Sequence, residues 1–169
     1  MFKKIILFCS LSGLVYASSD YGVSINTGKG GHIDLHRVAL QKTFSNTIYS
    51  FDSFDIKGYH ELAYGKFKGQ DHSRSVISYT PVFVLDFDKL FFDSYKYYVD
   101  LAVGVSRISH THIDSRRIST KFQFEDRISF GITRENWDLY LRYIHYSNAS
   151  IKKPNDGIDI ALLGLNYRF

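Results

Sequence analysis

The sequence contains almost no cysteine and almost no proline. One cysteine, Cys9, and two prolines occur among 169 residues. Cys9 lies in an amino-terminal segment that we expect to be removed on export, so the mature chain is predicted to contain no thiol. This excludes a disulfide framework and a thiolate metal site. Scarce proline, an aromatic content of 17% and repeated alternation favour an all-β chain.

A long apolar run is also missing. No stretch approaches the roughly 20 apolar residues that a membrane-spanning helix requires. The apolar segment from Ile5 to Tyr16 is too short for such a helix, and Val15 and Ala17 occupy the usual small-residue positions of a cleavage site. We therefore expect residues 1–17 to be a signal peptide and residues 18–169 to form a single exported domain.

Neither sign of charge is in large excess. The formal net charge of +4 falls to about +2 when the two amino-terminal lysines leave with the signal peptide. This balance is too small to indicate a nucleic-acid partner.

Apolar and polar residues alternate in eight runs of about ten residues each. The clearest run places Tyr97, Val99, Leu101, Val103 and Val105 on one row. An even number of such runs predicts an eight-stranded antiparallel transmembrane β-barrel without an open pore. The expected strands are residues 21–26, 32–44, 56–67, 75–87, 97–106, 121–130, 137–147 and 159–169.

The parity of a row does not reveal whether the row faces inward or outward. A soluble lipocalin-like barrel also has eight strands, but with apolar rows around an internal ligand. The terminal row Leu165, Tyr167 and Phe169 resembles the assembly signal of outer-membrane proteins and favours the membrane barrel. The faces of the second and third runs stay unassigned. Asp126 interrupts an apolar row, which requires a bulge or an interfacial position there.

With both termini in the periplasm, the connections after the odd-numbered runs face outward. Each of these connections carries at least one basic residue, which suits an outer leaflet of anionic, phosphate-bearing lipid. They are Gly28 to Gly31, Lys68 to Arg74, Arg107 to Arg117 and Asn148 to Gly157. The connections Asp86 to Lys96 and Thr133 to Asn136 are expected on the opposite side.

The last two runs carry polar residues at the loop end of their apolar rows. His145 and Ser147 end the row of the seventh run, and Asp159 begins the row of the eighth. Residues two apart on a strand lie on one face, about 7 Å from each other at Cα, so His145 can accept the hydroxyl proton of Ser147. If the hairpin pairs Asp159 with His145, the Asp159 carboxylate can hold the other N–H of the imidazole.

The motif HYSNA at residues 145–149, followed by KPNDGI at residues 153–158, resembles the PagL family of outer-membrane lipid A deacylases. The resemblance implies that His145 is the base, Ser147 the nucleophile and Asp159 the orienting acid. The family uses a glutamate at the last position, and Asp156 is an alternative acid in this chain.

The resemblance also points to Asn148 and Asn155 as oxyanion-hole candidates. Asn148 has the opposite parity to Ser147, so it can contribute only where the strand has already given way to the loop. Candidates for binding substrate phosphates or headgroups are Lys152, Lys153, Arg116 and Arg117.

The activity implied by the resemblance is that of a serine esterase in the outer membrane that removes the 3-O-linked acyl chain of lipid A through an acyl-enzyme. The expected partners are lipopolysaccharide and the outer membrane, and a homodimer is left open. No cofactor or metal is required. His110 and His112 lie in SHTHID without a matching carboxylate cluster, so a loop is predicted there rather than a metal site.

Two other functions remain open from the residues alone. A His-x-Ser sequence is common by chance, Asn-Asp-Gly is usually a turn, and polar residues are expected wherever a lipid-facing row ends. One alternative is a non-enzymatic small barrel that acts as an adhesin or structural anchor. The other is a different lipid A-modifying enzyme, such as an acyltransferase.

Overall fold

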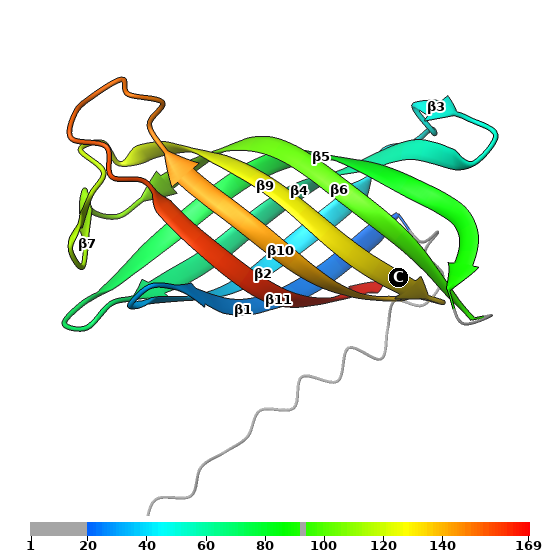
Figure 1. Ribbon diagram of the computed structural model, residues 1–169, viewed down its shortest axis with the longest axis horizontal. Helices are drawn as coiled ribbons and strands as arrows, with labels where there is room; N and C mark the ends of the chain where they lie inside the picture. Colours follow the sequence, from blue (N-terminus) through cyan, green and yellow to red (C-terminus); the bar gives the residue numbers. More distant parts are fainter. Residues whose placement is uncertain (1–19, 92–93) are drawn as a thin grey trace, which may run out of the picture.

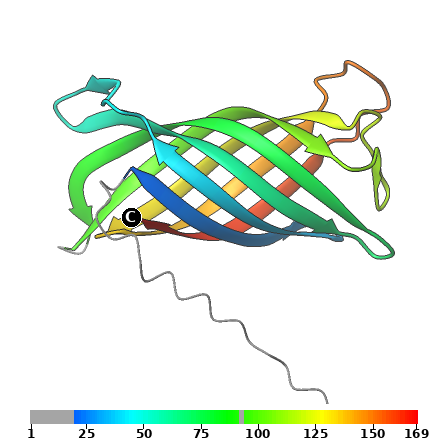
Figure 2. The ribbon, with the colours of Figure 1, turned by 180° about the vertical axis from the view of Figure 1, so that it is seen from behind.

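Eight long strands close into an antiparallel β-barrel in the computed structural model, which describes residues 20–91 and 94–169 (Figures 1 and 2). They are β1 (Tyr21–Gly30), β2 (Ile33–Thr43), β4 (Phe54–Lys68), β5 (Ser73–Phe91), β6 (Tyr95–Ile108), β9 (Phe122–Arg134), β10 (Trp137–Ser147) and β11 (Ile158–Arg168). Each pairs with the next along the chain, and β11 pairs with β1 to close the sheet. The predicted eight-stranded all-β fold is confirmed. The predicted signal peptide, residues 1–17, lies outside the described residues.

Three short strands lie outside the barrel wall. The first, β3 (Tyr49–Ser50), pairs with the start of β4, whereas β7 (His112–Ile113) and β8 (Arg116–Arg117) form a small hairpin between β6 and β9. β3 and the carboxy terminus lie at one end, here the terminal end, and β7 and the β10–β11 connection lie at the other, here the loop end (Figure 1). Among the described residues, no helix is long and apolar enough to span a membrane.

Two predicted connections are largely strand. The segment Gly28 to Gly31 is expected as a turn, but β1 continues to Gly30. The segment Asp86 to Lys96 is expected as a connection, but β5 continues to Phe91 and β6 begins at Tyr95. Both predictions are wrong because charged, aromatic and glycine residues can continue a hydrogen-bonded ladder after the apolar alternation has ended.

The apolar rows face outward around the barrel. Leu141 is 65% exposed and Val103 is 64% exposed, whereas the inward-facing Asp100, Arg142 and Asn166 are buried. A soluble lipocalin-like barrel would show the opposite arrangement, so that alternative is excluded. An apolar outer wall is the surface that a bilayer requires.

A network of ion pairs fills the middle of the barrel. Arg37 Nη2 lies 3.1 Å from Oε1 of both Glu61 and Glu125, and Arg127 pairs with Glu61. The guanidinium of Arg142 lies 3.4 Å from Asp100. All of these side chains are buried, and their mutual ion pairs and hydrogen bonds offset part of the cost of removing charge from water.

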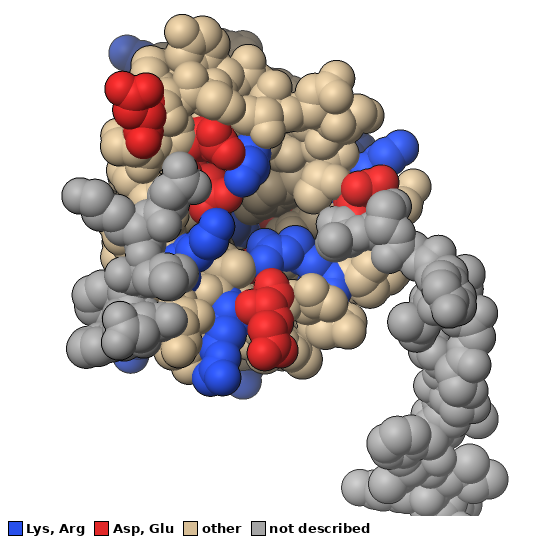
Figure 3. All heavy atoms as spheres, turned by 90° about the vertical axis from the view of Figure 1, so that its right-hand side faces the viewer, with Lys and Arg blue, Asp and Glu red and all other residues tan. Residues whose placement is uncertain are grey.

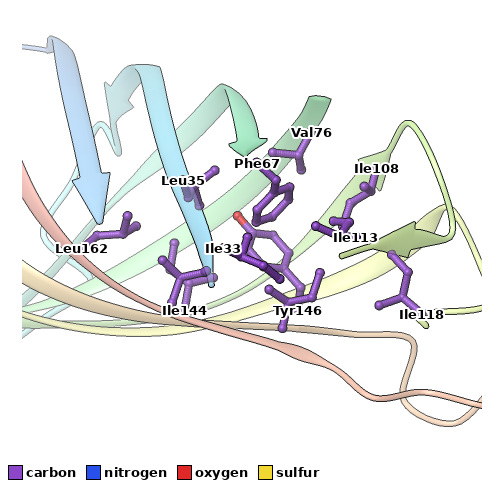
Figure 4. Packing of buried hydrophobic residues seen from close by; sticks show 12 residues of the cluster. Ile33, Leu35, Phe67, Val76, Ile108, Ile113, Ile118, Ile144, Tyr146 and Leu162 are labelled. Carbon is purple, nitrogen blue, oxygen red and sulfur yellow. The ribbon is translucent and has the colours of Figure 1, made fainter. Parts of the chain in front are cut away.

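The loop end of the interior is apolar, which the sequence does not predict. Residues of the wall strands, together with Ile113 of β7 and Ile118 directly after β8, form one buried cluster around Tyr146 and Phe67 (Figure 4). The rings of Tyr146 and Phe67 meet edge to face, with centroids 5.4 Å apart. This apolar plug seals the barrel directly behind the outward-facing row that carries His145 and Ser147.

The terminal end is hollow. A cavity of about 560 Å³ opens there, lined by both basic and acidic side chains (Figure 3). Its ion pairs include Lys57 with Asp86 at 2.6 Å and Arg168 with Asp138 at 2.9 Å. The barrel interior thus changes from a polar cavity, through an ionic network, to an apolar plug.

Candidate active site

Pairing between β10 and β11 places His145 directly opposite Asp159. Nδ1 of His145 lies 2.7 Å from Oδ1 of Asp159. A carboxylate can only accept here, so the contact fits a proton on Nδ1 and leaves Nε2 free to accept a proton. The structure therefore brings together two of the predicted site residues in the expected orientation.

Ser147 is the last residue of β10 and lies on the same outward row as His145, two positions further on. Both side chains are half-buried. Ser147 and His145, both among the described residues, form no hydrogen bond with each other. Such catalytic contacts are often long in a free enzyme and shorten when substrate binds.

Tyr143 is a site residue that the sequence does not single out. Its hydroxyl donates a hydrogen bond of 2.6 Å to Oδ1 of Asp159, the oxygen that also contacts His145. Tyr143 and His145 are two residues apart on the same row, and this spacing is the signal that could have identified Tyr143. The Asp159 carboxylate is thus held by two neighbours on β10.

A second carboxylate faces outward at the level of His145. Asp126 on β9 lies opposite His145, on the side away from Asp159. The ladders from β9 to its neighbours on both sides are continuous at this position, so the bulge that was one of the two predicted explanations is absent. Asp126 therefore interrupts the apolar row where that row reaches the polar side chains of the site.

The site lies on the outer wall of the barrel, at its loop end. The side chains of His145 and Asp159 are 37% and 45% exposed. Toward the terminal end, the outward row of β10 continues with the exposed residues Leu141 and Leu139. An apolar groove of about 750 Å³ crosses the neighbouring wall. Its outward-facing lining is Ile25, Thr27, His36, Val38, Tyr64, Lys66, Leu139, Leu163 and Leu165.

The two asparagines occupy different places in the β10–β11 loop. The side chain of Asn148 is buried, and its Nδ2 donates 2.9 Å hydrogen bonds to the carbonyls of Ile118 and Lys152. The side-chain oxygen of Asn155 accepts from the backbone N–H of Asn148 at 3.3 Å. This contact leaves the amide nitrogen of Asn155 as a donor next to the end of β10.

Asp156 is tied to the β7–β8 hairpin rather than to His145. Its Oδ2 accepts a 2.7 Å hydrogen bond from the backbone N–H of Arg117, and its carbonyl accepts from Arg116 at 3.3 Å. The hydroxyl of Ser119 also donates to the carbonyl of Pro154. These contacts join the two loops beside the site and place Arg116 and Arg117 at its edge. Lys152 and Lys153 are exposed on the β10–β11 loop.

His110 and His112 lie in the loop region between β6 and β9. The described residues contain no group of three or more His, Cys, Asp or Glu arranged to hold a metal ion. The Arg74 guanidinium lowers the pKa of the exposed His110. His112 lies in β7 and contacts Thr111 at 3.3 Å.

The fold and this arrangement define a class of protein, an eight-stranded membrane barrel that carries hydrolase-type side chains on its lipid-facing wall. Comparisons with known proteins agree. The profile of the family described as lipid A 3-O-deacylase (PagL) matches residues 35–168. The crystal structure of the outer membrane enzyme PagL superposes with a TM-score of 0.81 at 30% identity, covering 88% of this chain and 99% of that one.

Two relatives are similar in sequence. The lipid A deacylase PagL of Pseudomonas aeruginosa is 30% identical over 165 residues, which cover 93% of this chain and 94% of the relative. The lipid A deacylase PagL of Bordetella bronchiseptica is 41% identical over 76 residues, which cover 44% of this chain and 42% of the relative. The chain belongs to the lipid A 3-O-deacylase (PagL) family and is an outer-membrane β-barrel enzyme.

Proposed function

We propose that this protein removes the 3-O-linked acyl chain from lipid A in the outer leaflet, with Ser147 as nucleophile, His145 as base and Asp159 as orienting acid. The observation that carries this proposal is the 2.7 Å contact between His145 Nδ1 and Asp159 Oδ1 on the lipid-facing wall, in line with Ser147. Membership in the deacylase family supports the same substrate.

In this mechanism, His145 Nε2 takes the hydroxyl proton of Ser147 as the Ser147 oxygen attacks the ester carbonyl of lipid A. The tetrahedral intermediate collapses, and the sugar oxygen leaves with the proton held by His145. An acyl-enzyme ester on Ser147 remains. Water then attacks this ester with His145 again as base, which releases a hydroxy fatty acid and restores Ser147.

We assign the orienting role to Asp159 rather than to Asp156. Asp159 contacts His145 and also accepts a hydrogen bond from Tyr143, whereas Asp156 is bound to the backbone of Arg117. The shorter aspartate, in place of the family's glutamate, is compatible with this role because the cross-strand pairing brings its carboxylate within hydrogen-bond distance of the ring.

We assign stabilisation of the oxyanion to the side-chain amide of Asn155. Its oxygen is held by the backbone of Asn148, which leaves its N–H groups to donate to a developing negative charge. The side chain of Asn148 instead binds two loop carbonyls and supports the loop. Lys152 and Lys153, with Arg116 and Arg117 at the edge of the site, are proposed to contact the phosphates and headgroup.

The place of the site explains how a lipid can react without leaving the membrane. Transfer of an acyl chain from the bilayer to water costs about 0.8 kcal/mol per methylene. A chain that lies along the exposed Leu141 and Leu139 stays in an apolar environment while its ester reaches Ser147.

The test is the mass of lipid A after incubation with the full chain and with Ser147→Ala. A deacylase removes the mass of one hydroxyacyl chain, and this loss disappears in Ser147→Ala. An acyltransferase would add an acyl mass, and an adhesin or anchor would leave lipid A unchanged. Full deacylation by Ser147→Ala would show that the nucleophile is wrongly assigned.

A further inference from the structure

Gly157 lies against the edge of the His145 ring. It is buried, directly precedes β11 and has a φ of +63°. A Cβ at this position would lie 2.8 Å from Cε1 of His145 and 3.6 Å from Nε2. Carbon atoms in contact normally lie about 3.5–4.0 Å apart, so only a residue without a side chain leaves the ring where it is.

We propose that Gly157 is a positioning residue for His145, an inference that rests on the proposed role of His145 as base. Asp159 holds the ring at Nδ1, and the absence of a Cβ at position 157 leaves the space that Cε1 needs in this orientation. Cε1 is bonded to both ring nitrogens. A shift at Cε1 therefore displaces Nε2, the atom that takes the proton of Ser147.

The ring, rather than the loop, has to yield to a side chain at position 157. Ile158 is paired with Tyr146 in the sheet, and the backbone N–H of Asp156 donates to the carbonyl of Arg117 at 3.0 Å. The backbone is thus anchored on both sides of Gly157. The imidazole is the far end of a half-exposed side chain, held by its contact with Asp159, and it can move more readily than the anchored backbone.

Gly31 separates this effect from backbone strain. It has a φ of +60°, close to that of Gly157, but a Cβ there would meet nothing within 4 Å. An alanine at either position therefore incurs the same kind of conformational cost. Only the alanine at position 157 also pushes against His145.

The experiment compares Gly157→Ala with Gly31→Ala in the full chain, refolded in detergent and supplied with lipid A in mixed micelles. Fatty-acid release gives kcat and KM per folded molecule, and urea titration gives the unfolding midpoint. We expect similar midpoints for both variants and wild-type kcat for Gly31→Ala. In Gly157→Ala we expect kcat to fall about 10- to 100-fold with KM nearly unchanged, because a displacement of about 1 Å can cost 100-fold.

Equal kcat in the two glycine variants would overturn the positioning role. A higher KM in Gly157→Ala with an unchanged kcat would also overturn it. Ser147→Ala, measured alongside, distinguishes this failure from failure of the proposed function. If Ser147→Ala is inactive while the glycine variants match, only the role of Gly157 is wrong. If Ser147→Ala stays active, the proposed mechanism fails and the inference with it. Counting only folded molecules keeps the comparison decisive if Gly157→Ala folds in low yield.

Discussion

The two faces of β10 carry side chains with opposite surroundings. Outward, Tyr143, His145 and Ser147 are exposed or half-exposed on the lipid-facing wall. Inward, Ile144 and Tyr146 are fully buried in the apolar plug. Successive residues of one strand therefore belong in turn to the lipid-facing surface, which carries the proposed site, and to the sealed interior.

This alternation separates activity from stability. The outward polar side chains can be changed without opening the interior, because each strand residue points to only one side of the wall. The inward residues fix the backbone from which the outward ones project. We therefore expect substitutions at adjacent positions to have different consequences, depending on the face.

The largest effect is expected for the neighbouring pair His145 and Ile144. His145→Ala should lower kcat/KM by at least about 10⁴-fold, because the serine loses its base, while the unfolding free energy changes by less than about 0.5 kcal/mol. Ile144→Ala should instead lower the unfolding free energy by about 2–5 kcal/mol and retain the activity per folded molecule. Lipid A deacylation and urea titration measure the two quantities. If both variants lost both deacylation activity per folded molecule and unfolding free energy, the outward and inward faces of β10 would not be independent.

The next effect concerns the two aspartates beside the β10–β11 loop. Asp159→Asn should lower kcat about 10³- to 10⁴-fold, since an amide in place of the carboxylate no longer holds the proton on Nδ1. Asp156→Asn is the matched control and should change kcat less than about tenfold, because Asp156 binds the neighbouring hairpin. The reverse order of the two kcat values would assign the acid to Asp156.

A substitution in the buried ionic network is expected to lower stability without changing activity per folded molecule. Arg127→Met should lower the unfolding free energy by about 3–5 kcal/mol, because it leaves the buried Glu61 and Glu125 with fewer partners. The exposed Arg134, which contacts Tyr95, provides a control, and Arg134→Met should change stability by less than about 0.5 kcal/mol. Equal urea midpoints for the two variants would contradict a stabilising role for the network.

The smallest effect is expected at Tyr143. Tyr143→Phe removes one hydrogen bond to Asp159 and leaves the contact between Asp159 and His145. We expect kcat to fall about three- to tenfold, which corresponds to about 1 kcal/mol. An unchanged kcat in the deacylation assay would mean that cross-strand pairing alone positions Asp159.

The outer wall could be predicted from the sequence, whereas much of the interior could not. The outward residues Val99, Leu101, Val103 and Val105 of β6 are apolar, as expected for the part of a row that faces lipid. The inward row of β2 begins with Ile33 and Leu35 in the plug and continues with Arg37 in the ionic network. Neither row of β2 is uniform, so its faces could not be assigned from alternation.

The arrangement of the candidate site residues could be predicted as far as it is local. His145, Ser147 and Asp159 share one parity across a single hairpin, and the hairpin register needed only to pair them. The contacts of Asp156 with Arg116 and Arg117 span 40 and 39 residues, respectively, and depend on how two loops meet. Contacts of that kind leave no periodic signal. Asp126 did leave a signal, the break in its apolar row, but only the pairing with β10 relates it to His145.

The central claim is that residue 147 faces the membrane at the boundary between headgroups and acyl chains. Spin labels on cysteine introduced singly at positions 141, 147 and 151 would test it by accessibility to oxygen, which enriches in the bilayer, and to a water-soluble nickel complex. We predict oxygen-dominated relaxation at position 141, nickel-dominated relaxation at the exposed loop position 151 and intermediate values at position 147. A label at position 147 shielded from both reagents, as expected inside the barrel, would contradict the claim.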